Sequence, residues 1–151
     1  MEIIEGYSHL EIVNTLFIEY QHGLGVDLDF QDFANELNTL ASVYAKDKGR
    51  IFLAKDKDEI MGCIALKPFD ETTGEIKRLY VRASARQCGA GQALLKRVIE
   101  AAGVIGYQRL VLDTLESLTS AIHLYKRFQF YQIPPYYDNP LEHVLYFEKI
   151  L

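Results

Sequence analysis

The sequence lacks the features that mark membrane-spanning, secreted and metal-binding proteins. No run of 18 or more apolar residues is present, which excludes a predicted membrane-spanning helix. The first residues, MEIIEGYSHLEI, have neither the basic start nor the apolar centre of a signal peptide, so we expect a cytoplasmic protein. Only two cysteines occur, Cys63 and Cys88, without CxxC spacing, and the four histidines form no ligand pattern. We therefore expect neither a disulfide framework nor a bound metal.

Positive charge is also scarce. The net charge is −5 and the isoelectric point is near 5.4, which disfavours a nucleic-acid surface and mildly favours a cationic partner. The segment from Glu19 to Glu36 contains five acidic residues and no Lys or Arg. This run is either a solvated helical face or a surface that attracts cations, and the sequence leaves both interpretations open.

The size and composition predict one globular domain spanning residues 1–151. Hydrophobic residues make up 49% and charged residues 25% of the chain, which is typical of a soluble protein with one core. No internal repeat, linker or low-complexity segment divides the chain.

A strand, a glycine-bearing loop and an amphipathic helix follow one another between Glu75 and Gly106. The helix is predicted by apolar or small residues that recur on one face: Gly91, Leu94, Leu95, Val98, Ile99 and Ala102. Gly106 is placed to end this helix with a left-handed cap, and residues 109–114 follow as a second apolar strand. Together these elements predict a βαβ unit.

The loop from Arg86 to Gly91 is suited to binding an anion. It precedes a helix whose first N–H groups have no intrahelical partner, and Gly89 and Gly91 leave the backbone accessible. A dinucleotide fingerprint would require Gly or Ala where Leu94 stands, and a P-loop would require a Gly-Lys-Ser/Thr ending. What remains is an R-x-x-G-x-G pattern, or a tight turn that merely needs glycine.

Elsewhere, apolar periodicity and turn residues predict strands and helices in alternating groups. The strands are expected at residues 1–5, 50–55, 60–69, 75–81, 109–114, 130–133 and 143–151. Helices are expected from an N-cap at Ser8 to a stop at Gly23 and Gly25, from a cap at Asp29 through Phe33, Leu37 and Leu40, after the glycine loop, and over residues 118–128.

In this order of elements and in two motifs, the chain resembles the GNAT superfamily of N-acetyltransferases. The motifs are Leu79-Tyr80-Val81 followed by the R-x-x-G-x-G loop, and Ala121-Ile122-x-Leu124-Tyr125 followed by Phe130. The resemblance implies an α/β fold: a mixed, mostly antiparallel seven-stranded sheet with about four helices, in which strands 75–81 and 109–114 are parallel and splayed. The chain departs from the family at Gln129, where Gly is common, and at Leu118, where Asn is frequent.

The resemblance also implies acetyl-CoA as cosubstrate, with its pyrophosphate on the glycine loop. The loop residues concerned are Arg86, Gln87, Cys88, Gly89, Ala90, Gly91 and Gln92. A bulged strand would direct the N–H of Leu79 or Tyr80 at the thioester carbonyl, and Val81 would pair with the pantetheine amides.

For catalysis, the family match makes Tyr125 the candidate general acid, since a phenol with a pKa of about 10 stays protonated at neutral pH. The alternative is a core tyrosine. Glu75 matches the family's strand glutamate and is the candidate base, with Glu19 and Asp113 in reserve. Because Glu75 and Leu79 are about 13 Å apart along a strand, Glu75 would need a bulge or a water chain, and it could equally be a solvent-facing carboxylate. Cys88 has no partner histidine motif, so we reject covalent catalysis.

Acceptor binding is expected from Glu19, Tyr20, Tyr136 and Tyr137, because aromatic faces and carboxylates suit an ammonium group. The tyrosines of the 134–140 loop could instead only form a turn. We expect direct acetyl transfer to a primary amine of a small molecule or peptide in a ternary complex, without nucleic-acid or membrane partners. A non-catalytic acetyl-CoA sensor and a possible homodimer stay open.

Overall fold

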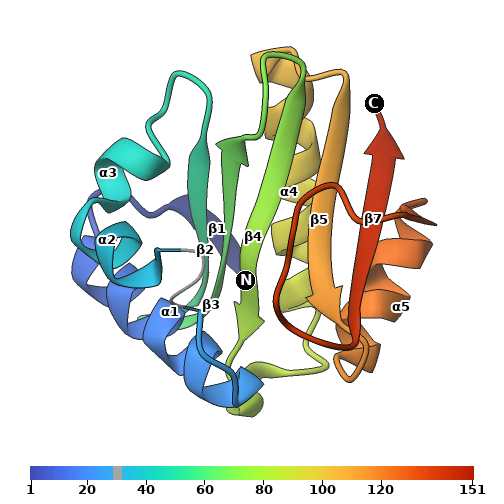
Figure 1. Cartoon of the computed structure of the whole chain (residues 1–151). Helices are drawn as coiled ribbons and strands as arrows, with labels where there is room; N and C mark the ends of the chain where they lie inside the picture. Colours follow the sequence, from blue (N-terminus) through green and yellow to red (C-terminus); the bar gives the residue numbers. More distant parts are fainter. Residues whose placement is uncertain (29–31) are drawn as a thin grey trace.

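The computed structural model describes residues 1–28 and 32–151 and contains one seven-stranded sheet (Figure 1). The strands lie in the order β1-β2-β3-β4-β5-β7-β6. Their bounds are β1 (Glu2–Glu5), β2 (Arg50–Asp56), β3 (Glu59–Pro68), β4 (Thr73–Val81), β5 (Arg109–Leu115), β6 (Tyr131–Ile133) and β7 (Val144–Ile150). The described helices are α1 (Leu10–Leu24), α2 (Phe33–Asn38), α3 (Leu40–Val43), α4 (Ala90–Ile105) and α5 (Thr119–Arg127), with a 3₁₀ turn at Ala83–Ala85.

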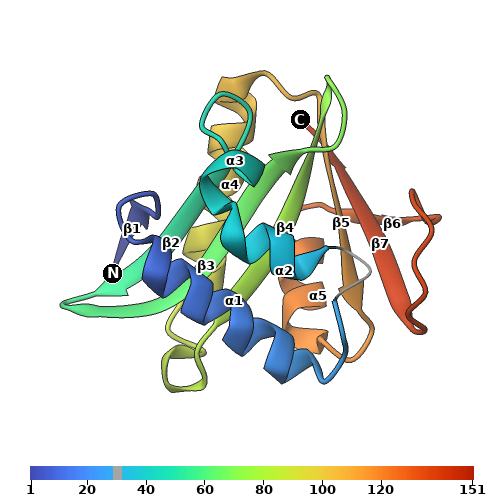
Figure 2. The ribbon, with the colours of Figure 1, turned by 60° about the vertical axis from the view of Figure 1, so that its left-hand side comes forward.

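Helices cover both faces of the sheet and create two cores. Helices α1 to α3 lie on one face, and α4 and α5 lie on the other (Figures 1 and 2). Alternate residues of β2 divide between these cores: Phe52 and Ala54 pack with α4, while Ile51 and Leu53 pack with α1. Because both faces are buried, β2 and β3 are continuous apolar runs rather than alternating ones.

The predicted parallel contact between β4 and β5 is confirmed, and it is short. Thr73, Gly74 and Glu75 pair with Arg109, Leu110 and Val111. Every other neighbouring pair of strands in the described sheet is antiparallel. Beyond the parallel contact, β4 and β5 separate toward their C-terminal ends (Figure 2). The sheet therefore opens at its centre.

A β-bulge lies in β4 beside this opening, as the family resemblance implied. Cys63 and Ala65 of β3 oppose Tyr80 and Lys77 of β4, so three steps along β4 match two along β3. Arg78 falls within this stretch and has a φ of 61°, in the left-handed region that few non-glycine residues adopt. The backbone of β4 is thus redirected just before Leu79.

Several predicted helix ends were wrong. Helix α1 begins after His9 rather than Ser8, with no side-chain capping bond. Of the two glycines predicted to stop it, Gly25, with a φ of 68°, ends the helix, and Gly23 lies inside it. The predicted second helix is divided at Thr39 into α2 and α3. Its expected cap, Asp29, lies outside the described residues.

The predicted left-handed cap after α4 is confirmed. Gly106 has a φ of 105°, and its N–H donates to the carbonyl of Ala102 at 3.1 Å. This cap ends α4 and turns the chain back into β5. The helix and the parallel strand contact therefore close the predicted βαβ unit.

Candidate active site at the opening between β4 and β5

A small pocket occupies the place where β4 and β5 separate. It is reached by side chains from both faces of the sheet, because the missing strand contact leaves a passage between them. Its lining residues are Tyr20, Ile76, Lys77, Arg78, Leu79, Asp113, Thr114, Leu118, Ala121 and Tyr125. Tyr20 comes from α1 and Tyr125 from α5, on opposite sides of the sheet. The pocket brings together the bulge, one carboxylate and the predicted acid.

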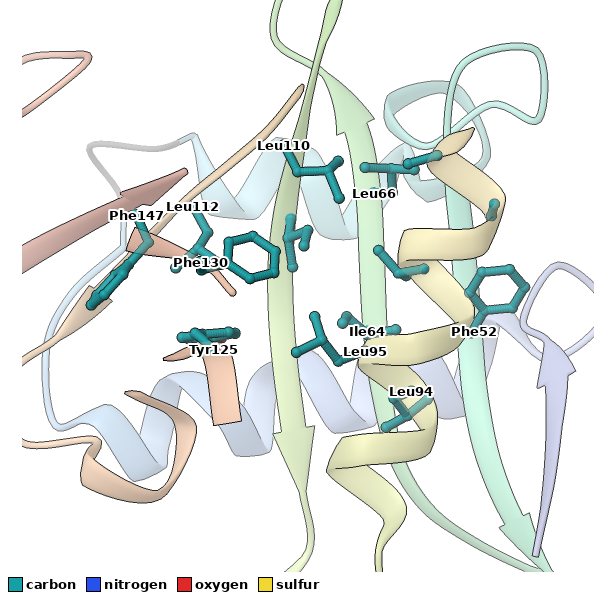
Figure 3. Close-up of a cluster of buried hydrophobic side chains, with 14 of the residues drawn as sticks. Phe52, Ile64, Leu66, Leu94, Leu95, Leu110, Leu112, Tyr125, Phe130 and Phe147 are labelled. Carbon is teal, nitrogen blue, oxygen red and sulfur yellow. The ribbon is translucent and has the colours of Figure 1, made fainter. Parts of the chain in front are cut away.

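Tyr125 is both a core residue and a pocket residue. The residue is 5% exposed, and its ring centroid lies 5.8 Å from that of Phe130 and 6.2 Å from that of Phe147. Figure 3 shows the three rings within the buried cluster. Within the described part of the chain, its hydroxyl forms no hydrogen bond. Burial, with smaller contributions from Tyr20 and Asp113, raises the pKa of Tyr125 well above its usual value. The phenol therefore keeps its proton at neutral pH.

Two carboxylates and a lysine lie beside the pocket. The Lys77 ammonium is 3.9 Å from Glu75 Oε2 and 4.0 Å from Asp113 Oδ1, and all three side chains are at most 12% exposed. Glu75 is therefore not the solvent-facing carboxylate of the alternative interpretation. Burial lowers the pKa of Lys77, while Glu75 and Asp113 oppose that shift. Asp113 lines the pocket, whereas Glu75 lies behind Lys77.

The tyrosines of the β6–β7 loop hold these carboxylates in place. Tyr136 donates its hydroxyl to Glu75 Oε2 at 2.7 Å, and Tyr137 donates to Asp113 Oδ2. The Asn139 amide also donates to Asp113 Oδ2, at 3.2 Å. Burial first, and then the negative charge of Glu75, raises the pKa of Tyr136. The loop reaches back over the sheet and is more than a tight turn.

The carboxylate of Glu19, the remaining candidate for the acceptor site, already forms an ion pair with Arg82. Arg82 donates to both of its oxygens, at 3.1 and 2.9 Å, and the Tyr80 hydroxyl donates to Oε1 at 3.1 Å. The hydrogen bond from Arg82 is the main cause that lowers the pKa of Glu19. A carboxylate with a lowered pKa is a poor proton acceptor, so Glu19 is less suited to the reserve role of base.

Sequence reasoning missed a buried ion pair behind the bulge. Arg78 donates to Glu36 through Nε at 3.0 Å and through Nη2 at 2.7 Å, and both side chains are nearly inaccessible to solvent. The Tyr44 hydroxyl donates to the same carboxylate at 2.9 Å. The available signal was a charged residue inside an apolar strand, but nothing in the sequence indicated a partner 42 positions earlier.

The glycine loop has the backbone geometry that an anion site requires. Gly89 is the N-cap of α4, with a φ of 86°, and the first i→i−4 bond of the helix runs from Ala93 N–H to its carbonyl. The N–H groups of Ala90, Gly91 and Gln92 therefore precede the helical ladder. Adding a Cβ at Gly89 would meet no atom within 4 Å, so the space over this turn is open. The residues present fit a bound pyrophosphate.

The side chains of this loop are directed elsewhere. Arg86 is exposed, and its Nε donates to the carbonyl of Val81 at 3.1 Å. Cys88 is also exposed, and its thiol donates to the carbonyl of Ala85. Gln92 accepts a bond from Arg127 at 3.2 Å. Gly91 faces Leu124 and Val81, at 3.4 and 3.8 Å from a Cβ placed there.

The described residues contain no group of three or more His, Cys, Asp and Glu placed to hold a metal ion. In the part of the chain that the structure describes, no helix has both the length and the apolar character needed to cross a membrane.

The sheet is split, one strand is bulged, and a helix N-terminus that suits a phosphate lies beside the opening. This combination is typical of acyl-CoA-binding transferases, and known proteins similar to this chain belong to the same class. The profile described as the Acetyltransferase (GNAT) family matches residues 11–130. An uncharacterized N-acetyltransferase of Schizosaccharomyces pombe is 38% identical over 139 residues, which cover 91% of this chain and 85% of that protein. The chain belongs to the GNAT acetyltransferase family.

Solved structures show the same fold. An acetyltransferase from Streptococcus agalactiae superposes with a TM-score of 0.81 at 22% identity, over 99% of this chain and 98% of that one. A GNAT family acetyltransferase from Elizabethkingia anophelis, with acetyl-CoA bound, gives a TM-score of 0.60 at 31% identity, over 74% and 82% of the two chains. The protein is an acyl-CoA-dependent N-acetyltransferase.

Proposed function

We propose that the protein transfers the acetyl group of acetyl-CoA directly to the primary amine of a cationic acceptor, with both substrates bound at once. The observation that carries this proposal is the pocket at the opening of the sheet, where Leu79, Asp113 and Tyr125 meet. These residues supply a backbone donor, a proton acceptor and a proton donor. Direct acyl transfer requires these three groups.

The cosubstrate site combines the glycine loop and the C-terminal half of β4. Acetyl-CoA, when bound, supplies a thioester carbonyl that an amine attacks. The N–H groups of Ala90, Gly91 and Gln92 hold the pyrophosphate, and Arg86, Gln87 and Cys88 form the turn before them. The backbone of Leu79 and Tyr80 polarises the carbonyl, and Val81 pairs with the pantetheine arm.

Tyr125 donates a proton to the leaving sulfur as the C–S bond breaks, and the acceptor nitrogen, which loses its second proton as the amide forms, restores the phenol. Its hydroxyl has no competing acceptor among the described residues, and its raised pKa keeps it in the donating form. The ring is fixed by Phe130 and Phe147, so the hydroxyl is held in place before the substrates arrive.

Asp113 receives the first proton from the acceptor ammonium, and Glu75 lies behind it. Sequence reasoning ranked Glu75 first, but Asp113 is the carboxylate that lines the pocket. Lys77 lies within 4.0 Å of both carboxylates. The ammonium of Lys77 balances the negative charge of both carboxylates, and Tyr136 holds Glu75 in place by a hydrogen bond.

The acceptor is a cation because its amine must approach Asp113 past aromatic faces. Tyr20 lines the pocket, and the rings of Tyr136, Tyr137 and Tyr146 pack together beside it, with centroids 5.3 to 6.0 Å apart. Aromatic faces and a carboxylate favour an ammonium over a neutral or acidic group. The net charge of −5 supports the same preference.

The test is a free-thiol assay with acetyl-CoA and a panel of cationic, neutral and acidic amines, alongside calorimetric binding of CoA. We expect thiol release with cationic primary amines and rates that fall as ionic strength rises. Preference for neutral or acidic acceptors contradicts the assigned substrate class. CoA binding without thiol release against any amine favours the non-catalytic sensor instead.

A further inference from the structure

Arg78 occupies a backbone conformation that its own chemistry does not favour. Its φ of 61° lies in the left-handed region, where a Cβ is strained and glycine is the usual residue. It lies within the stretch of β4 that carries the extra residue of the bulge. Such a conformation persists only when surrounding contacts hold it.

Those contacts come from the face of the sheet that α1, α2 and α3 cover (Figure 1). Glu36 of α2 accepts two hydrogen bonds from the guanidinium, at 3.0 and 2.7 Å. The rings of Phe33 and Tyr20 lie 5.2 and 5.9 Å from its central carbon. Tyr44, which follows α3, donates a third hydrogen bond to Glu36. The hydrogen bonds and the ring contacts therefore fix the position and the orientation of the Arg78 guanidinium.

The backbone of the same residue is fixed from the opposite strand. The thiol of Cys63 lies 3.3 Å from the Arg78 carbonyl oxygen, to which it donates, and Cys63 also pairs with Tyr80. The next residue, Leu79, lines the pocket. Rotation of the Arg78 backbone would therefore change the direction of the Leu79 N–H relative to the pocket.

We propose that Glu36 is a positioning residue for acetyl transfer, because its ion pair with Arg78 holds the bulge that aims the Leu79 N–H into the pocket. The inference rests on the proposed function, since it assigns that N–H to the thioester carbonyl. Buried ion pairs contribute little net stability compared with apolar residues of similar volume. Control of backbone geometry accounts for this pair better than stability does.

The first experiment replaces Glu36 with glutamine in the full chain. Glu36→Gln keeps the size of the side chain and removes its charge. We expect kcat to fall about 10- to 100-fold, as misplacement of about 1 Å can do, with the Kd of CoA unchanged within about twofold. The ¹⁵N-labelled amide resonances of Leu79 and Tyr80 should shift. Unchanged kcat per folded molecule overturns the proposal.

A control and a second variant separate positioning from stability. Glu148→Gln removes a carboxylate from another ion pair, with Arg109, on β7, which β5 separates from β4; it should leave kcat and the Leu79 resonance unchanged. The double substitution Glu36→Leu with Arg78→Met replaces the buried pair by apolar groups. We expect its melting temperature to match or exceed that of Glu36→Gln while kcat stays low. Wild-type kcat in this double variant overturns the proposal, because the pair would then be only structural.

Failure of the proposed function has a different signature. If the wild-type protein releases no thiol with any amine, the assigned reaction is wrong. The amide resonances then test the inference without turnover, and unchanged Leu79 and Tyr80 signals in Glu36→Gln overturn it.

Discussion

The glycine loop and the pocket, which the proposed function assigns to one reaction, are built in opposite ways. The loop, residues 86–92, is continuous in sequence; its backbone N–H groups are the proposed ligand donors, while Arg86 and Cys88 bond to neighbouring backbone. The pocket draws side chains from α1, β4, β5 and α5. A backbone site depends on glycine and conformation, whereas a side-chain site depends on burial and on distant partners. Substitutions should therefore behave differently in the two regions.

The largest effect is expected from a charged side chain in the loop. Gly89→Glu forces a non-glycine residue to a φ of 86° and places a carboxylate beside the proposed pyrophosphate site, so calorimetry should detect no CoA binding. Gly103→Glu is the matched control, since Gly103 is an exposed residue within α4 with no atom near its Cβ position. Full CoA affinity in folded Gly89→Glu would remove the pyrophosphate from this loop.

In the pocket, removal of one hydroxyl should affect turnover and leave binding intact. Tyr125→Phe keeps the ring against Phe130 and Phe147, so kcat should fall by roughly 10²-fold with the Kd of CoA nearly unchanged. Tyr107→Phe is the control: it removes another buried hydroxyl, which donates to the Lys48 carbonyl at 2.6 Å away from the pocket. A change of threefold or less in kcat for Tyr125→Phe would remove Tyr125 from the mechanism.

We expect a smaller difference in kcat/KM between variants of the two carboxylates, Asp113 and Glu75. Asp113→Asn keeps an oxygen for Tyr137 and removes the charge that lines the pocket, so kcat/KM for the amine should fall about 10- to 100-fold. Glu75→Gln, behind Lys77, should lower it less. Steady-state kinetics with varied amine measure both variants. A larger loss in Glu75→Gln would restore Glu75 as the first proton acceptor.

The smallest expected effect concerns stability at high pH. Burial raises the pKa of Tyr20 to about 12, while tyrosine in an unfolded chain titrates near 10. Between these values the unfolded state loses a proton that the folded state keeps, so the free energy of unfolding falls as pH rises, by at most about 1.4 kcal/mol per unit. Tyr20→Phe should reduce the slope in urea denaturation between pH 10 and 11. An identical slope would mean that Tyr20 is well solvated.

The sequence predicted what local chemistry determines. The left-handed cap at Gly106, the helix that follows Gly89 and the short parallel contact all lie within one βαβ unit, where spacing and glycine placement carry the information. The predicted start of α1 was wrong because Ser8 and Glu11 have the spacing of a capping box, but no side chain caps the helix. The division of the next helix at Thr39 has no proline or glycine to mark it.

The side-chain site was only partly predictable. Tyr125 was found through its motif, but the Glu36–Arg78 pair joins residues 42 positions apart, and no local pattern links them. Tyr136 was predicted to bind the acceptor, which stays a prediction, but the hydrogen bond from its hydroxyl to Glu75, 61 positions away, was not foreseen. Such contacts depend on how the elements pack, which periodicity alone does not report.

Because β2 and β3 are buried on both faces, the order in which the chain is synthesised decides when each face becomes covered. Helix α1 precedes these strands in the chain and can cover one face as soon as they pair. The other face, with Phe52, Ile64 and Leu66, stays open until α4 is made, well after β3 ends at Pro68. A nascent chain stalled before Ala90 would present an uncovered apolar sheet to the ribosome exit and to other chains. Transiently exposed apolar surface of this kind promotes aggregation, so we expect the interval before α4 is made to be the vulnerable one.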